Sequence, residues 1–130
     1  MSHRESITVP DIAHKFPVPN ACRIDNIVVS GAIQPMDPVT RAIPDDLAAQ
    51  CANMFKNLKS VVEAAGGTTD DIIKVNVFIR DRNDREPLNA EWMRMFPDSG
   101  SRPARHAQPL LVEGAALIQC DFMAVIQDRK

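Results

Sequence analysis

The sequence predicts an α+β domain in which two helices pack on one face of a mixed β-sheet. Segments with a period-two or β-branched pattern alternate with segments whose apolar residues recur every three or four positions. Their order is strand, helix, strand, helix, strand, strand. The chain has 130 residues, the size of one ordinary domain, so we expect a single domain over residues 1–130.

The first predicted strand covers residues 24–30, which are mostly β-branched and precede Gly31. A loop is expected over residues 35–40, because two prolines and an aspartate there favour turns. Ser30 and Gly31 form the turn that ends the strand. Its backbone N–H groups could serve an oxyanion or a carboxylate, although such turns are usually only structural.

The strongest periodic pattern predicts an amphipathic helix over residues 46–65. The acidic residues 45 and 46 can cap its N-terminus, and the glycines at 66 and 67 can end it. The predicted buried face consists of Ala48, Cys51, Phe55, Leu58, Val62 and Ala65.

A second strand and a second helix follow. Residues 73–79 alternate between apolar and mixed positions, which predicts a strand with Ile73, Val75, Val77 and Ile79 on its buried face. Asn83 or Asp84 is expected to cap the helix, and Pro97 to end it. Its apolar side would consist of Leu88, Trp92, Met95 and Phe96.

Two more strands complete the sheet. Residues 102–109 lie between prolines, which favours a short strand near an edge. Residues 117–126 form the last predicted strand, with one wholly apolar face and a second face that carries Gln119 and Asp121. If both helices cover one side of the sheet, the other side, with Phe78 and Met123, would expose an apolar patch in a monomer. We therefore expect self-association.

Charge and composition exclude several classes of protein. Fifteen basic residues against seventeen acidic ones leave a net charge of −2, and the chain has no tyrosine, which argues against nucleic-acid binding and against a ribonuclease. The N-terminus lacks a signal peptide and no apolar run is long enough to span a bilayer. Three cysteines without metal-ligand spacing fit a reducing compartment, so a cytoplasmic protein without a metal is expected.

Four residues are candidates for chemistry. His14 and His106 share no metal-binding spacing and are expected to be surface or hydrogen-bonded histidines. Arg105 either forms a salt bridge, which spacing alone favours, or holds a small organic acid. Asp121 is either paired with a basic residue, again favoured by pattern alone, or holds and polarises a water molecule.

Taken together, these residues resemble the reactive-intermediate deaminases, also called the Rid or YjgF family. The resemblance extends over nearly the whole chain after about residue 16 and depends on the order and spacing of several short motifs. They are Val28-Val29-Ser30-Gly31, Asp37-Pro38, the helix end at 61–66, the strand at 71–79, Leu88-Asn89-Ala90 and Arg102-Pro103-Ala104-Arg105.

The resemblance implies a chorismate-mutase-like (YjgF) fold with a six-stranded mixed sheet and two helices. It also implies a homotrimer whose open sheet faces form a central barrel, with sites in the clefts between subunits. Members that act as deaminases hydrolyse 2-imino or 2-enamino acids to 2-keto acids and ammonia, and they need no cofactor.

The resemblance also implies roles for particular residues. Arg105 matches the arginine that holds the substrate carboxylate, and Asp121 falls where the family commonly has a glutamate that holds the attacking water. Further substrate-binding positions are Ser30, Gly31, Asn89 and Ala107.

Several departures from the family pattern leave the substrate open. Ala107 stands where the family has a cysteine, with His106 before it, and Asp121 is one methylene shorter than the usual glutamate. The aromatic residue of the N-terminal Pro-Tyr-Ser segment is also missing. A larger or different imine or enamine acid is therefore an alternative substrate. The remaining alternatives are a non-catalytic sensor of small acids and a deaminase of another C–N substrate in a catabolic pathway. We expect a small carboxylate-bearing substrate and neither nucleic acid nor membrane as a partner.

Overall fold

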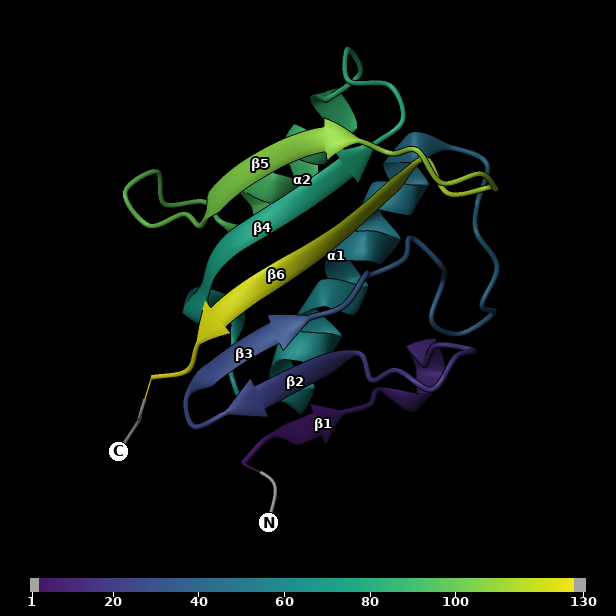
Figure 1. Ribbon diagram of the computed structural model, residues 1–130. Coiled ribbons are helices and arrows are strands. Elements are labelled where there is room, and N and C mark those ends of the chain that lie inside the picture. The colour runs from purple at the N-terminus through teal and green to yellow at the C-terminus, as the bar shows by residue number, and fades with distance from the viewer. Residues whose placement is uncertain (1–2, 128–130) are drawn as a thin grey trace.

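The computed structural model describes residues 3–127, which form a mixed six-stranded sheet with both α-helices on one side (Figure 1). The strand order is β1-β2-β3-β6-β4-β5, and only β4 and β5 are parallel. The strands are β1 (Glu5–Ile7), β2 (Ala21–Ile24), β3 (Ile27–Ser30), β4 (Ile72–Ile79), β5 (Ala104–Pro109) and β6 (Ile118–Val125). The α-helices are α1 (Leu47–Ala64) and α2 (Glu86–Met95). Two short 3-10 helices cover Pro10–Ile12 and Thr69–Asp71. The predicted α+β class and mixed sheet are confirmed.

The single strand predicted over residues 24–30 is wrong, because a hairpin turn interrupts it. Strands β2 and β3 pair antiparallel, with Ile24 opposite Ile27. Asp25, in the two-residue turn, has a φ of 52°, a left-handed conformation that a short polar side chain tolerates. β-branched residues on both sides of the turn give the segment the composition of one continuous strand.

Helix α1 confirms the first predicted helix. The Asp46 carboxylate caps it by accepting hydrogen bonds from the backbone N–H groups of Ala48, at 2.9 Å, and Ala49, at 3.3 Å. The prediction that Ala48 is buried is wrong. The buried face is centred on Met54, Leu58 and Val61, so Ala48 falls at its border and is exposed.

The start of β4 and the start of α2 also differ from prediction. The register with β6 shifts between Ile72 and Lys74, so Ile72 is buried and Ile73 is exposed. Helix α2 begins at Glu86, and no side chain caps it. Asn83 and Asp84 are therefore not caps; Pro87, whose fixed φ suits the first turn of a helix, marks its start instead.

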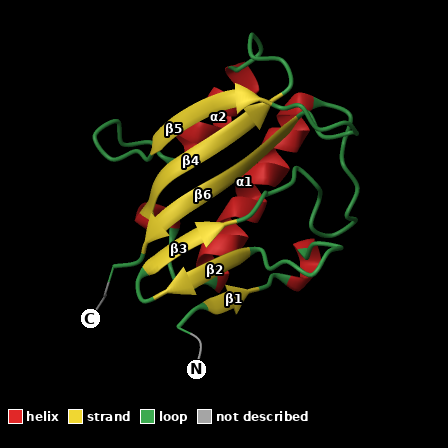
Figure 2. Ribbon diagram, viewed as in Figure 1, coloured by secondary structure: helices red, strands yellow, loops and turns green. Residues whose placement is uncertain are grey.

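As expected, helices cover one face of the sheet and leave the other face open. The centre of the face toward the helices is apolar and fully buried, around Val75, Val77 and Cys120. No helix lies in front of the other face (Figure 2). There four large apolar side chains are more than a third exposed, namely Ile24, Ile27, Val29 and Met123. No helix within residues 3–127 is long and apolar enough to cross a membrane.

Candidate functional site

Arg105 lies on the edge strand β5, on the side of the sheet that faces the helices. The parallel register places it beside Val75, a core residue of β4. Its Nη2 donates a 2.8 Å hydrogen bond to Oδ1 of Asn89, and its Cζ lies 4.9 Å from the ring centroid of Trp92. Both partners belong to α2, so one helix holds the guanidinium by a hydrogen bond and a cation–π contact.

The guanidinium of Arg105 has no acidic partner within residues 3–127, so the salt bridge that spacing favoured is wrong. Its Nη1 is buried without a hydrogen-bond partner among these residues. Burial and, second, the positive charge of Arg85 lower the pKa of Arg105. The positive charge of Arg105 is half-buried beside a second positive charge, and no negative charge from residues 3–127 offsets it. A bound carboxylate would supply that negative charge.

Asp121 lies on β6, on the open face of the sheet. Its Oδ1 accepts a 2.8 Å hydrogen bond from Nδ2 of Asn76, which is directly opposite in β4. The predicted pairing with a basic residue is therefore wrong, since a neutral amide takes that place. On the other side of Asn76 lies His106 of β5, which is exposed, as expected for a surface histidine.

The Asp121 side chain lines a pocket of about 490 Å³ on the open face, within the size range of small-molecule sites. Phe78, Gln119 and the segment 108–112 form most of the remaining wall. Sequence reasoning did not assign Gln119 to the site. The alternation of β6 could have found it, because Gln119 and Asp121 are two residues apart on the same face.

The turn at Ser30 and Gly31 does not offer a free Gly31 amide, so for this group the structural alternative applies. The Gly31 N–H donates a 3.0 Å hydrogen bond to the Asn20 carbonyl, next to the β2–β3 ladder. The Ser30 hydroxyl accepts from the Phe122 N–H and donates to the Gly31 carbonyl, both at 2.9 Å. These groups extend the pairing at the end of β3.

Within one chain, the structure brings together only part of the predicted site. Arg105 and Asn89 are in contact, and Ala107 lies two residues further along β5, on the same side of the sheet. Asp121 lies on the opposite face. No group of histidine, cysteine and acidic side chains within residues 3–127 could hold a metal ion.

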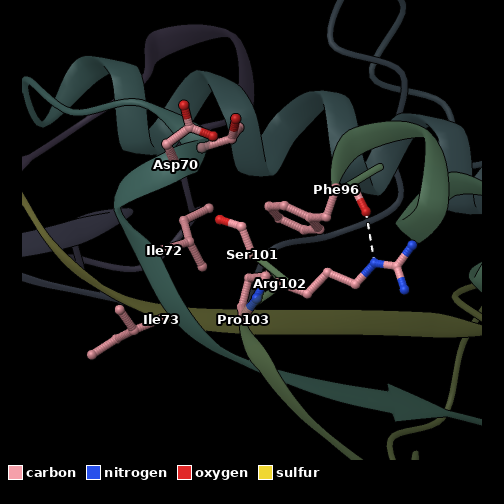
Figure 3. Close-up of a pocket in the computed structure, with 8 residues that line it drawn as sticks. Asp70, Ile72, Ile73, Phe96, Ser101, Arg102 and Pro103 are labelled. Carbon is pink, nitrogen blue, oxygen red and sulfur yellow. Dashed lines mark hydrogen bonds between the residues drawn. The ribbon is translucent and has the colours of Figure 1, made fainter. Parts of the chain in front are cut away.

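A separate hollow of about 220 Å³ lies between the start of β4 and the segment before β5 (Figure 3). Asp70, Phe96 and Ser101 line it, and the guanidinium of Arg102 turns away to donate a 2.8 Å hydrogen bond to the Phe96 carbonyl. It contains none of the predicted site residues.

The fold and these side chains define a class of small α+β domains. In this class two helices pack on one face of a six-stranded mixed sheet, and each face of the sheet carries polar side chains that are candidates for a functional site. A sequence model of the family described as Endoribonuclease L-PSP matches residues 10–121. The chain therefore belongs to this family, also known as the YjgF/Rid family.

Three similar proteins illustrate the relationship. A RutC family protein of Haemophilus influenzae is 36% identical over 91 residues, which are 68% of this chain and 70% of the relative. A 2-iminobutanoate/2-iminopropanoate deaminase of Salmonella typhimurium is 40% identical over 80 residues, 61% of this chain and 62% of the relative. The crystal structure of RidA from the Antarctic bacterium Psychrobacter sp. matches with a TM-score of 0.84 at 26% identity, over 94% of this chain and 99% of that one.

Proposed function

We propose that the protein is a deaminase that hydrolyses 2-imino or 2-enamino acids to 2-keto acids and ammonia. Arg105 would hold the substrate carboxylate, and Asp121 would hold the attacking water. Attack of this water on C2 of the imine gives a carbinolamine. Loss of ammonia then leaves the keto group, with Asp121 moving the protons. The reaction needs no cofactor, and we propose that it takes place in the cytoplasm.

The observation that carries the proposal is the environment of Arg105. The buried Nη1 without a partner and the absence of an acidic partner within residues 3–127 leave the guanidinium suited to a carboxylate ligand. Deaminase-named relatives at 36–40% identity support the reaction class. The Asn89 side chain, which accepts from Nη2, would hold the guanidinium in place.

Because Arg105 and Asp121 lie on opposite faces, we propose that each site is shared between two copies in a homotrimer. The exposed Ile27, Val29 and Met123 on the open face would be covered by neighbouring copies. Asp121 of one copy would then approach the β5 edge of the next, where Arg105 and Ala107 lie. Ser30 and Gly31 would contribute to the binding surface of such a cleft.

Complementation between inactive variants tests the shared site. Arg105→Ala and Asp121→Ala are each expected to lose ammonia release from 2-iminobutanoate. When the two chains are co-expressed, mixed trimers contain some clefts with both native residues, and about a quarter of wild-type activity returns. Arg94→Ala is the matched control and is expected to keep full activity, because Arg94 is an exposed arginine on α2 whose ion pair is with Glu91.

Each outcome bears on a different part of the proposal. Inactive single variants without complementation would overturn the shared site and leave the anchoring role of Arg105. Full activity of Arg105→Ala would overturn the anchor itself. Binding of 2-ketobutanoate without ammonia release by the wild-type protein would make it a small-acid sensor.

The oligomeric state is tested by light scattering during gel filtration. We expect the mass of a trimer at micromolar concentration, and a monomer for Val29→Asp, which places a charge on the open face. Lys59→Asp, an exposed change on the helix side, is expected to remain trimeric. A monomeric wild-type protein would contradict the proposal.

A further inference from the structure

A second pocket, of about 370 Å³, lies between the N-terminal segment and the loop that follows β3. It contains neither Arg105 nor Asp121, and it shares no lining residue with the pocket of about 490 Å³ on the open face. Its wall is formed by Ile12, Ala13, His14, Lys15, Phe16, Gln34, Met36, Arg41 and Ile43.

Apart from Arg41, the polar side chains of this pocket have hydrogen-bond donors that are not engaged within residues 3–127. His14 is half-buried, and its Nε2 is buried without a hydrogen-bond partner within residues 3–127. The Lys15 ammonium is exposed and has no ion pair among these residues. The Gln34 side chain accepts from Gln119, which leaves its own amide N–H groups for another partner. No aspartate or glutamate lines the pocket.

The other walls are apolar. Ile12, Met36 and Ile43 form most of them, and Phe16 stands beside them with 76% of its surface exposed. Covering this exposed aromatic ring with a hydrocarbon group would remove apolar surface from water, which favours binding. The pocket therefore combines an apolar lining with hydrogen-bond donors that could bind an acceptor group of a ligand.

Arg41 fixes the shape of the pocket. Its backbone has a φ of 65°, an uncommon conformation for a residue with a side chain. Its guanidinium donates to the carbonyls of Asp11, at 2.8 Å, and Ala13, at 3.2 Å, which joins the two walls. Asn20 holds the same segment through a 3.1 Å hydrogen bond from Nδ2 to the Ile12 carbonyl. A pocket held open in this way loses little conformational entropy when a ligand enters.

We propose that this pocket binds a small carboxylate with an apolar body. The carboxylate would accept hydrogen bonds from Lys15, Gln34 and the His14 ring, and the hydrocarbon would pack on Ile12, Phe16 and Met36. The positive charge of Arg41, although its donors are engaged, adds to the attraction for an anion. The pocket contains neither Arg105 nor Asp121, and its His14 ring lies next to Gly31, which we assign to the shared cleft.

The test uses hexanoate and the whole 130-residue chain with ¹³C-labelled methionine methyl groups. Hexanoate is expected to shift the Met36 methyl resonance saturably. Acetate, which lacks the apolar body, and hexan-1-ol, which lacks the charge, are expected to bind at least about tenfold more weakly. Met36→Leu assigns the resonance.

Variants separate this site from the candidate active site. Lys15→Met, a change at an exposed side chain, is expected to weaken hexanoate binding about tenfold, and His14→Leu to weaken it as well. Lys59→Met, an exposed change on α1, and Arg105→Ala are expected to leave it unchanged. Equal affinity in Lys15→Met and wild type, or no saturable shift at Met36, would overturn the proposal. Loss of the shift in Arg105→Ala would instead assign hexanoate to the Arg105 site.

Discussion

Arg105 and Asp121 point to opposite faces of one sheet, although only β4 separates the strands that carry them. Val75 of β4 lies beside Arg105 on one side and Phe122 on the other, whereas the next residue, Asn76, lies beside Asp121. Side chains of successive strand residues alternate between faces. A small acid bound to Arg105 therefore cannot reach Asp121 of the same chain, which is the reason for proposing a site shared between copies.

Asn76→Ala tests whether the orientation of Asp121 matters to catalysis. The change removes the 2.8 Å hydrogen bond that holds the Asp121 carboxylate. A hydrogen bond to a charged group contributes about 1.5 kcal/mol or more, so we expect kcat for 2-iminobutanoate to fall about tenfold, with KM nearly unchanged. Steady-state ammonia release measures both constants. Asn83→Ala, in an exposed turn, is the control, and an unchanged kcat in Asn76→Ala would remove Asn76 from the mechanism.

Gln50→Leu tests how the loop between β5 and β6 is held. Gln50 is fully buried; its Nε2 donates to the carbonyls of Pro44 and Ala115, and its Oε1 accepts from the Leu117 N–H at 2.7 Å. Leucine keeps the volume and leaves these backbone groups unpaired, so we expect a loss of about 3 kcal/mol in the free energy of unfolding.

Urea unfolding measures the loss, and hydrogen exchange at the Leu117 amide is expected to accelerate in Gln50→Leu. Asn53→Leu, which removes a single 3.2 Å hydrogen bond to the Pro35 carbonyl, is expected to cost about 1 kcal/mol. Equal losses in the two variants would contradict the assigned role of Gln50.

The fold was largely predictable where one face of an element is apolar over several turns or pleats. Helix α1 and strand β6 satisfy this condition, and both lie close to their predicted bounds. The hairpin was missed although Asp25 and Asn26 are residues that favour turns, because the β-branched residues on both sides dominated the prediction. Strand β1 has three residues, of which only Ile7 is buried, so it carries no periodic signal.

The candidate site was predictable as a set of residue types but not as an arrangement. The sequence singles out Arg105, yet its environment is set by Asn89 and Trp92, which come from a helix more than a dozen residues away along the chain. The parallel register of β4 and β5 decides which face Arg105 occupies. Likewise, the Gly31 amide is engaged by Asn20, a contact between strands that local turn chemistry does not reveal.

Gly66→Ala tests the end of α1. Gly66 has a φ of +95°, which is strained for any residue with a Cβ, and a Cβ there would lie 2.8 Å from Nη1 of Arg23. That nitrogen donates to the Ala65 carbonyl, so moving the side chain away would break a helix-end hydrogen bond. We expect Gly66→Ala to lower the free energy of unfolding by about 1–3 kcal/mol in urea titrations.

Gly100→Ala is the matched control for the same substitution. A Cβ at Gly100 meets only Oδ1 of Asp98, at 3.5 Å, an ordinary contact. We expect a change within about 0.5 kcal/mol. Similar losses in the two variants would show that the left-handed conformation is not what Gly66 provides.

The buried cysteines predict how stability depends on alkaline pH. Burial, with smaller contributions from Glu91, raises the pKa of the Cys51 thiol from 9.0 to about 12. Burial likewise raises the pKa of Cys120, with Asp121 adding to the effect. Above pH 9 the unfolded chain therefore loses thiol protons that the folded chain keeps. Because the unfolded state then binds fewer protons, the free energy of unfolding falls as pH rises, by about 1 kcal/mol per pH unit for each thiol.

Urea unfolding at fixed protein concentration between pH 8 and pH 11 measures this slope, and the absence of tyrosine removes one competing group that titrates there. Cys51→Ala is expected to lower the stability at every pH, because it leaves a cavity, and to make the slope shallower, because one titrating thiol is gone. Parallel slopes in wild type and Cys51→Ala would show that the Cys51 thiol ionises as readily in the folded protein as in the unfolded chain.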